Sequence, residues 1–162
     1  MRPARTFRLD HLHSPRMLPQ VRESLQDSAS RDRESPWLLH EGGVESRDLL
    51  LTARATMARF LNAGDDGEIL WTASGSEAIN LATKGFQPSD ESRRHLLHLA
   101  GDHPAVQGAV HWQEARGWTV TRVPCDVHGL TTTSGILESL RPETSFVCLS
   151  LANHDLGAIT PL

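Results

Sequence analysis

The chain has 162 residues, which is enough for one domain with a hydrophobic core, because a chain of this size buries roughly 70% of the surface that it exposes when unfolded. Hydrophobic residues make up 38% of the sequence and charged residues 22%, a composition within the globular range that argues against global disorder. The formal net charge of -4, with arginines scattered among acids, disfavours nucleic acid and anionic membrane surfaces as partners.

No apolar run approaches the roughly 20 residues that cross a bilayer. The first ten residues also lack the hydrophobic stretch of a signal peptide. We therefore expect a cytoplasmic protein without a membrane partner.

Cysteine and lysine usage limits the possible chemistry. Cys125 and Cys148 lie in segments that we interpret as buried or half-buried strands, which favours reduced core residues over a disulfide or a metal pair. The pair His11 and His13 has no thiols at zinc-ligand spacing, so we expect no metal site. Lys84 is the only lysine among 16 basic residues, and any reaction that needs a lysine amine within this chain must use it.

The N-terminal third divides into an arm and a helix. Residues 1–36 are polar and rich in turn formers, which predicts an irregular N-terminal arm with one short helix after Pro19. Apolar residues three and four positions apart then predict an amphipathic helix from Ser46 to Asn62, ended by Gly64. We assign residues 37–162 to the domain proper.

Downstream, apolar runs alternate with helical patterns. We expect strands at 68–72, 96–99, 119–123 and 145–150, and helices at 77–84, 104–115 and 134–140. This alternation predicts an α/β fold with a mostly parallel sheet and helices on both faces. Ligands bind such sheets at the carboxyl ends of the strands, so we expect the loops 74–76 and 152–155 at one edge, with His103 beside them.

The loop from Ser74 to Glu77 has the features of a phosphate site. Gly75 lets the backbone approach a ligand, the serines supply hydroxyl groups, and a helix start favours an anion. The alternative is that Ser74 or Ser76 only caps the helix.

Two other polar segments follow predicted strands. His103 stands directly before Pro104, which suits the first turn of a helix, although a single histidine is more often a capping or surface residue than a catalytic one. Asn153, His154 and Asp155 together could hold a ligand, while turn chemistry alone also explains the Asn and the Asp.

In their order along the chain, these segments resemble the cysteine desulfurases of the class V aminotransferase group, which use pyridoxal 5'-phosphate (PLP). The matching segments are Leu9-Asp10, His40-Glu41-Gly42-Gly43 with Arg54, Trp71 to Gly85, Asp102 to Val106, and Asn153 to Gly157 with Pro161. The resemblance implies that residues 37–162 are the N-terminal part of a PLP-transferase large domain of fold type I.

By this resemblance, Gly75 and Ser76 bind the cofactor phosphate. His103 corresponds to the catalytic histidine that stacks on the pyridine ring and is implicated in proton transfer. His154 corresponds to the second Asn of the family's Asn-Asn-Glu, which hydrogen-bonds the cofactor's phenolic oxygen, and Asn153 corresponds to the first.

The sequence departs from the family pattern in several places. His154 replaces an Asn, Asp155 shortens a Glu, and residues 11–15 are bulkier than the family's small segment. The sequence also stops before the Asp that pairs with the pyridine nitrogen, the Schiff-base lysine and the sulfur-accepting cysteine of the family. Lys84 aligns behind the phosphate loop, away from the Schiff-base position.

The function that the resemblance implies is PLP-dependent sulfur mobilisation from L-cysteine, with this chain truncated and inactive alone. A homodimer or a missing C-terminal half, and sulfur-acceptor proteins, are the expected partners. Two alternatives stay open: a non-catalytic pseudoenzyme that serves as a binding or dimerisation module, and another class V activity such as selenocysteine lyase.

Overall fold

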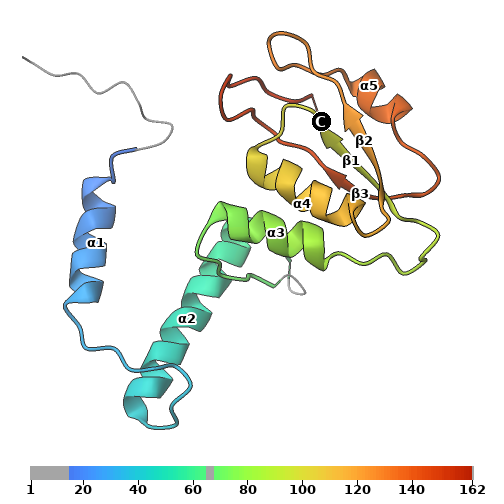
Figure 1. Ribbon diagram of the computed structural model, residues 1–162. Coiled ribbons are helices and arrows are strands. Elements are labelled where there is room, and N and C mark those ends of the chain that lie inside the picture. The colour runs from blue at the N-terminus through green and yellow to red at the C-terminus, as the bar shows by residue number, and fades with distance from the viewer. Residues whose placement is uncertain (1–14, 65–67, 162) are drawn as a thin grey trace, which may run out of the picture. The chain divides into compact units, whose positions relative to one another are not determined.

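A computed structural model of the protein describes residues 15–64 and 68–161. They fall into two compact units, the first ending at Trp71 and the second beginning at Thr72. The first unit contains helices α1 (Pro19–Ala29) and α2 (Glu41–Phe60). The second contains α3 (Gly75–Gly85), β1 (His95–Leu99), α4 (Pro104–Glu114), β2 (Thr119–Val123), α5 (Thr133–Glu138) and β3 (Thr144–Cys148) (Figure 1). No helix in the described part of the chain is long and apolar enough to cross a membrane.

The first unit contains both predicted helices. The expected short helix after Pro19 is α1, which has that proline in its first turn. The second helix starts earlier than the predicted Ser46, because the pair Gly42 and Gly43 continues into α2 instead of forming a turn. Gly43 is buried, and a Cβ atom there would overlap the backbone carbonyl of Leu38. This close approach explains why a poor helix former stands inside the helix.

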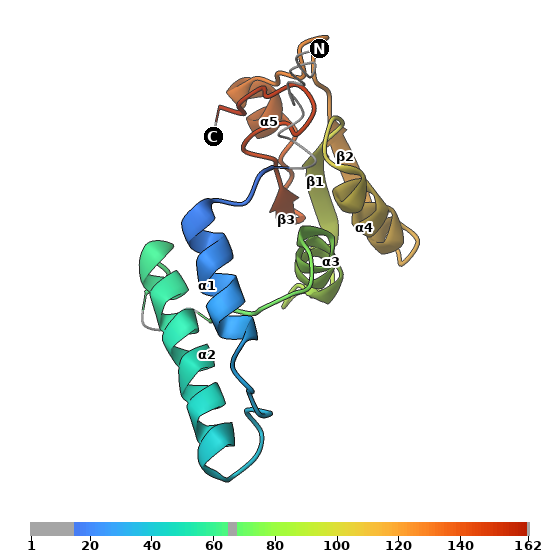
Figure 2. The ribbon, with the colours of Figure 1, turned by 90° about the vertical axis from the view of Figure 1, so that its left-hand side faces the viewer.

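The second unit is built on a parallel sheet, as predicted. The strand order is β2-β1-β3, and β1 pairs in parallel with both neighbours. Side chains of β1 alternate between the faces: Leu96 packs with residues of α4, and Leu97 packs with Ile136 of α5. Figure 2 shows these two helices on opposite sides of the sheet. The α/β fold with flanking helices is thus confirmed for this part of the chain.

Two sequence predictions are wrong. Residues 68–72 form no strand, because no other described segment pairs with them. A strand needs a neighbour to accept and donate its backbone hydrogen bonds. The side chains of Leu70 and Trp71 stay half exposed. Cys125 does not lie on a strand either, because β2 ends at Val123 and Pro124 follows. Cys148 is the last residue of β3, as expected. The divergent segment 11–15 and the pair Leu9-Asp10 lie outside the described residues, except for Pro15.

His95 joins all three strands at the start of β1. It is fully buried, with Nδ1 2.7 Å from Oγ1 of Thr144 on β3 and Nε2 2.9 Å from Oγ1 of Thr121 on β2. Burial lowers the pKa of His95, and the charge of Arg141 lowers it further, against an opposing effect of Glu143. The neutral imidazole is therefore the form that the folded sheet favours.

The stability of the protein should therefore depend on the protonation of His95. Because its pKa in the folded state lies below the ordinary value of about 6.5, the unfolded chain takes up the proton first, and the free energy of unfolding should fall as the pH drops below that value. Urea unfolding between about pH 5 and pH 8 measures this slope. In His95→Gln, which lacks the titrating group, the slope should be shallower, and an equal slope in both proteins would contradict the assignment.

Two glycines of α4 and its C-terminal turn should respond oppositely to alanine. Gly108 lies inside α4 with nothing within 4 Å of an added Cβ, so Gly108→Ala should raise the free energy of unfolding by about 1 kcal/mol through helix propensity. Gly117, the predicted helix terminator, has φ of 88°, and Gly117→Ala should lower it by about 1 kcal/mol. Thermal unfolding followed by circular dichroism measures both changes, and equal signs would contradict the analysis.

Candidate functional site

The start of α3 is a capped helix end, at the position where the sequence predicts a phosphate site. Ser74 is the N-cap, and its Oγ accepts from the backbone N–H of Glu77 at 3.1 Å. The Glu77 carboxylate turns back and accepts from the N–H of Ala73 at 2.6 Å. The first N–H groups of a helix lack acceptors within the helix. Gly75 and Ser76 are both exposed, so their N–H groups are candidates to bind a ligand. The capping interpretation is confirmed, and the phosphate site stays a prediction that the capping does not exclude.

His103 occupies the start of α4. It is the N-cap residue, exposed to solvent, and its Nδ1 accepts from the backbone N–H of Ala105 at 3.1 Å. Pro104 provides the first helical residue, as its fixed φ allows. Capping thus uses Nδ1 of His103 and leaves Nε2 outside this hydrogen bond.

His154 meets His103 at the carboxyl edge of the sheet. The two ring centroids are 4.7 Å apart with an interplanar angle of 62°, an edge-to-face contact. His154 is partly buried, and its Nε2 lies 3.3 Å from Oδ2 of the exposed Asp155. The segments after β1 and β3 therefore converge, as expected for neighbouring parallel strands.

Asp102 holds this convergence together. Its buried carboxylate accepts from the N–H of Leu99 at 2.8 Å and from both the N–H and the hydroxyl of Ser150, at 3.2 and 2.5 Å. Burial raises the pKa of the Asp102 carboxyl, but contacts with His98, Ser150 and Leu99 outweigh this effect, so the net pKa lies below its usual value. The side chain stays ionised and links the end of β1 to the residues that follow β3.

Asn153 makes a second link between the same two segments. Its Nδ2 donates to the carbonyl of Gly101 at 3.0 Å, while its Oδ1 accepts from the N–H groups of Asp155 and Leu156, both at 2.9 Å. Both ends of this amide are therefore used within the protein. It is His154, not Asn153, that contacts His103.

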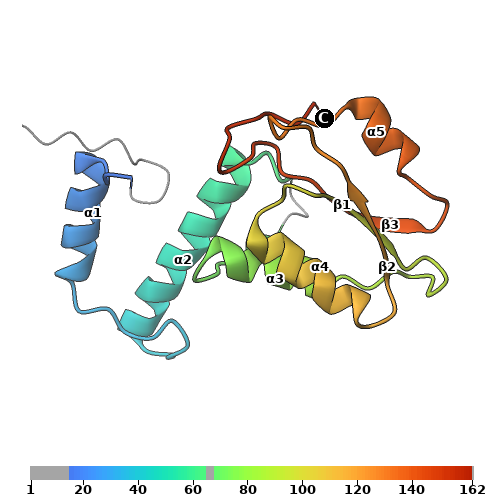
Figure 3. The same cartoon turned by 45° about the horizontal axis from the view of Figure 1, so that its top comes forward.

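The starts of α3 and α4 lie at one end of the unit. Figures 1 and 3 show the two helices side by side and running in the same direction. Near their C-terminal ends, Nε2 of Gln113 donates to the carbonyl of Thr83 at 2.7 Å. Gly75 and Ser76 therefore lie at the same end of the helix pair as His103.

Lys84 lies at the other end of α3. Its Nζ is 5.5 Å from the centroid of the Trp112 ring, and Cζ of Arg116 is 3.5 Å from the same centroid. Lys84 belongs to the last turn of α3, one helix length away from Gly75. The only lysine of the chain is thus held in a cation–π contact and does not reach the predicted cofactor site.

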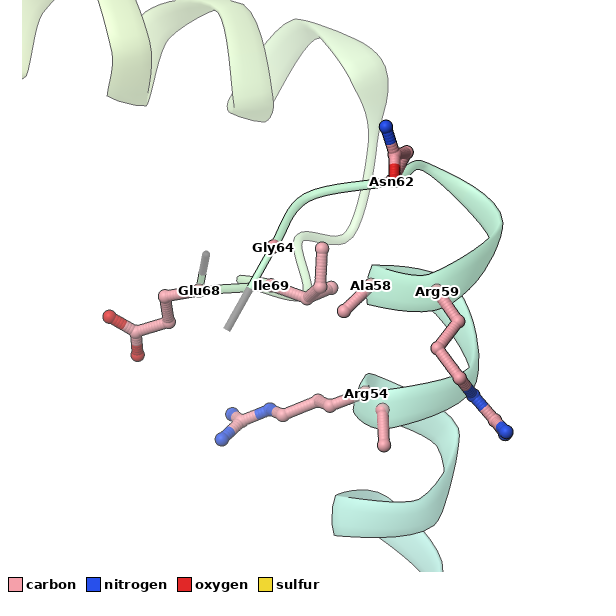
Figure 4. Close-up of a pocket in the computed structure, with 8 residues that line it drawn as sticks. Arg54, Ala58, Arg59, Asn62, Gly64, Glu68 and Ile69 are labelled. Carbon is pink, nitrogen blue, oxygen red and sulfur yellow. The ribbon is translucent and has the colours of Figure 1, made fainter. Parts of the chain in front are cut away.

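A separate cavity of about 530 Å³ lies in the first unit, beside α2. Its lining residues are Arg54, Ala55, Ala58, Arg59, Asn62, Gly64, Glu68 and Ile69. Figure 4 shows Arg54 and Glu68 pointing to the same side and Arg59 pointing away. None of the predicted site residues lines this cavity, so it carries no part of the cofactor argument.

Sequence reasoning assigned no role to Asp102 or Ser150. The available signal was an acid three residues after the end of a buried strand, while Ser150 stands two residues after the end of a neighbouring parallel strand. Its partner Ser150 is 48 positions away, which local patterns do not connect.

Residues 14–162 match the family described as Aminotransferase class-V. The chain belongs to this family. It is 27% identical over 155 residues to cysteine desulfurase IscS of Dictyoglomus turgidum and 30% identical over 155 residues to putative cysteine desulfurase IscS 1 of Bacillus subtilis. These matches cover 95% of the chain but 39% and 41% of the two relatives, so the chain spans about two fifths of their length.

Solved structures agree with this assignment. SspA in complex with cysteine superposes with a TM-score of 0.81 at 26% identity, over 96% of this chain and 45% of that one. DndA from Streptomyces lividans gives a TM-score of 0.76 at 26% identity, over 88% and 40%. The fold of the chain is therefore that of part of these proteins. Together with the family match and the relatives named cysteine desulfurase, this confirms the resemblance drawn from the sequence.

The residues at the sheet edge are compatible with PLP, the cofactor of this family. The free N–H groups at the start of α3 suit a phosphate, and the exposed ring of His103 offers a surface for an aromatic ring. The poorest match is His154, because its imidazole packs against His103 and lacks the two-proton donor of an amide.

Removing the charge of Asp102 should weaken the fold measurably. In Asp102→Asn, the amide group must face N–H or O–H donors, and the free energy of unfolding should fall by about 2 kcal/mol. Urea unfolding measures the change. Asp155→Asn is the matched control: that side chain is exposed, and the expected change is within about 0.5 kcal/mol. Similar losses in both variants would argue against a special role of the buried carboxylate.

Proposed function

We propose that this chain supplies the PLP-binding part of a cysteine desulfurase-type protein that mobilises sulfur from L-cysteine. The observation that carries the proposal is the contact of His103 with His154 at the carboxyl edge of the sheet, at the same end as the start of α3. Family membership and the relatives named cysteine desulfurase support it. The similar structure of SspA in complex with cysteine supports the choice of substrate.

Each residue of the proposed site has a distinct task. The N–H groups of Gly75 and Ser76, with the Ser76 hydroxyl, hold the phosphate of PLP. His103 stacks on the pyridine ring, and His154 contacts the phenolic oxygen. The bound cofactor supplies the electron sink for chemistry on an amino acid. Asp102 and Asn153 keep the two histidines in place through their hydrogen bonds.

The proposed reaction needs groups from outside these 162 residues. Lys84 is held against Trp112, far from the phosphate position, and burial raises the pKa of the Cys148 thiol, with a further contribution from the Asp102 charge. A thiol with a raised pKa is a poor nucleophile. We propose that a further segment, in the same protein or in a second chain, provides the lysine and the sulfur-accepting cysteine, that the reaction takes place in the cytoplasm, and that acceptor proteins receive the sulfur.

The second candidate is a non-catalytic relative that binds PLP or a partner without turnover. The imidazole of His154, at a position where the family resemblance implies an amide, favours this alternative. Its packing against His103 occupies ring surface that a cofactor would otherwise use.

The purified chain should bind PLP reversibly, without covalent attachment. Hydrogen bonds and a helix dipole worth about 1 kcal/mol hold the phosphate, and no lysine reaches it. Absorbance spectra and mass spectrometry after borohydride reduction measure attachment, and sulfide release from cysteine measures turnover. A reduced adduct on Lys84 together with sulfide production would overturn the proposed division of labour.

Gly75→Pro tests the phosphate position itself. Proline suits the first position of α3, and the extended backbone of Ser74 (φ -160°, ψ 161°) is compatible with a following proline. The variant loses one N–H donor while keeping the helix, so its affinity for PLP should fall about fivefold. Gly85→Ala, at the opposite end of α3, is the control and should bind PLP as the parent chain does. Equal affinity of Gly75→Pro and the parent would contradict the proposed site.

A further inference from the structure

The hydrogen bond at the start of α4 defines where the proton of neutral His103 lies. The backbone N–H of Ala105 points to Nδ1 of His103 at 3.1 Å. A backbone amide only donates, so Nδ1 must present its lone pair. A neutral imidazole carries one proton, which must therefore lie on Nε2.

The surrounding turn keeps this arrangement in place. Pro104 has no N–H, so the amide of Ala105 is the first donor of the helix, and it has no acceptor within the helix. On the other side of His103, the Asp102 carbonyl accepts from Nε2 of Gln107 at 2.7 Å. Rotation of the His103 ring away from Ala105 would leave that amide without its protein acceptor.

We propose that the backbone amide of Ala105 is a positioning group that fixes His103 in the Nε2–H tautomer. Neutral His103 then presents a hydrogen-bond donor, not a proton acceptor, to a ligand at the sheet edge. To act as a base through Nε2, the ring must first give up its bond to Ala105. The tautomer is a property of the chain itself, whereas its consequence for a bound cofactor or substrate rests on the proposed function.

Nuclear magnetic resonance of the full chain, labelled with ¹⁵N-histidine and free of PLP, tests the proposal. At alkaline pH, where the imidazole is neutral, the ring ¹⁵N shifts of His103 should report a protonated Nε2 and an unprotonated Nδ1. His103→Gln assigns the signals by their loss. A protonated Nδ1 in the parent chain would overturn the proposal.

Ala105→Pro removes the N–H donor at the second position of α4, within its first turn. The ratio of the Nδ1–H to the Nε2–H tautomer of His103 should rise about fivefold, the factor that one ordinary hydrogen bond provides. Ala105→Gly keeps the amide and should leave the ratio as in the parent. An unchanged ratio in Ala105→Pro would show that Ala105 does not set the tautomer.

Two further measurements keep the outcome decisive. If Ala105→Pro does not fold, replacement of residue 105 by lactate substitutes an ester for the amide and removes the same donor, with the same expected change. PLP binding, measured on Gly75→Pro and the parent chain, is independent of this readout. Equal PLP affinity of Gly75→Pro and the parent chain, with the tautomer of His103 as expected, counts against the proposed function alone. A protonated Nδ1 of His103, with the expected fall in PLP affinity, counts against the present proposal alone.

Discussion

One buried carboxylate, that of Asp102, joins two chain segments that lie 48 positions apart. A carboxylate is suited to this task because both of its oxygens accept, and every partner here donates: the amide of Leu99, and the amide and hydroxyl of Ser150. Burying a charge is costly unless hydrogen bonds compensate. The contact is therefore sensitive to any change that removes a donor, and the positions of His103 and His154 depend on it.

The two ends of the sheet are held by different chemistry. At the amino end, His95 bridges the three strands through hydroxyl groups of Thr144 and Thr121, in a neutral network. At the carboxyl end, the ionised Asp102 links the end of β1 to the segment after β3 through two amides and a hydroxyl. Lowering the pH weakens the first link by protonating the histidine and the second by protonating the carboxylate, so both contributions favour the folded state near neutral pH.

Local sequence patterns predicted the helices and strands whose signals lie within a few neighbouring residues. Strand β2 runs over Thr119–Val123 as predicted, and α4 begins at Pro104, because periodicity and proline placement are read within a few residues. The prediction of a strand at residues 68–72 is wrong for a physical reason. The apolar residues suit a strand, but a strand must pair with a neighbour, and the sequence of this segment does not specify one.

The sequence predicted those site residues whose positions follow from the ends of the strands. Placing His103 and His154 at one edge required only the parallel order of the strands and the family resemblance. The task of Asn153 was not predictable, because turn residues and ligand-binding residues have the same composition. The Asn153 side chain forms hydrogen bonds with Gly101, Asp155 and Leu156, and these partners are identified only by the folded structure.

The parallel packing of α3 and α4 also has an electrostatic consequence. The N-terminal end of each helix carries about half a positive charge from its aligned peptide dipoles. The N-terminal ends of α3 and α4 lie on the same side of the unit. The Glu77 carboxylate offsets part of this potential at α3. The helix contribution arises from the backbone and does not titrate, so the attraction of this sheet edge for anions should depend on how far the carboxylates of Glu77 and Asp102 oppose it.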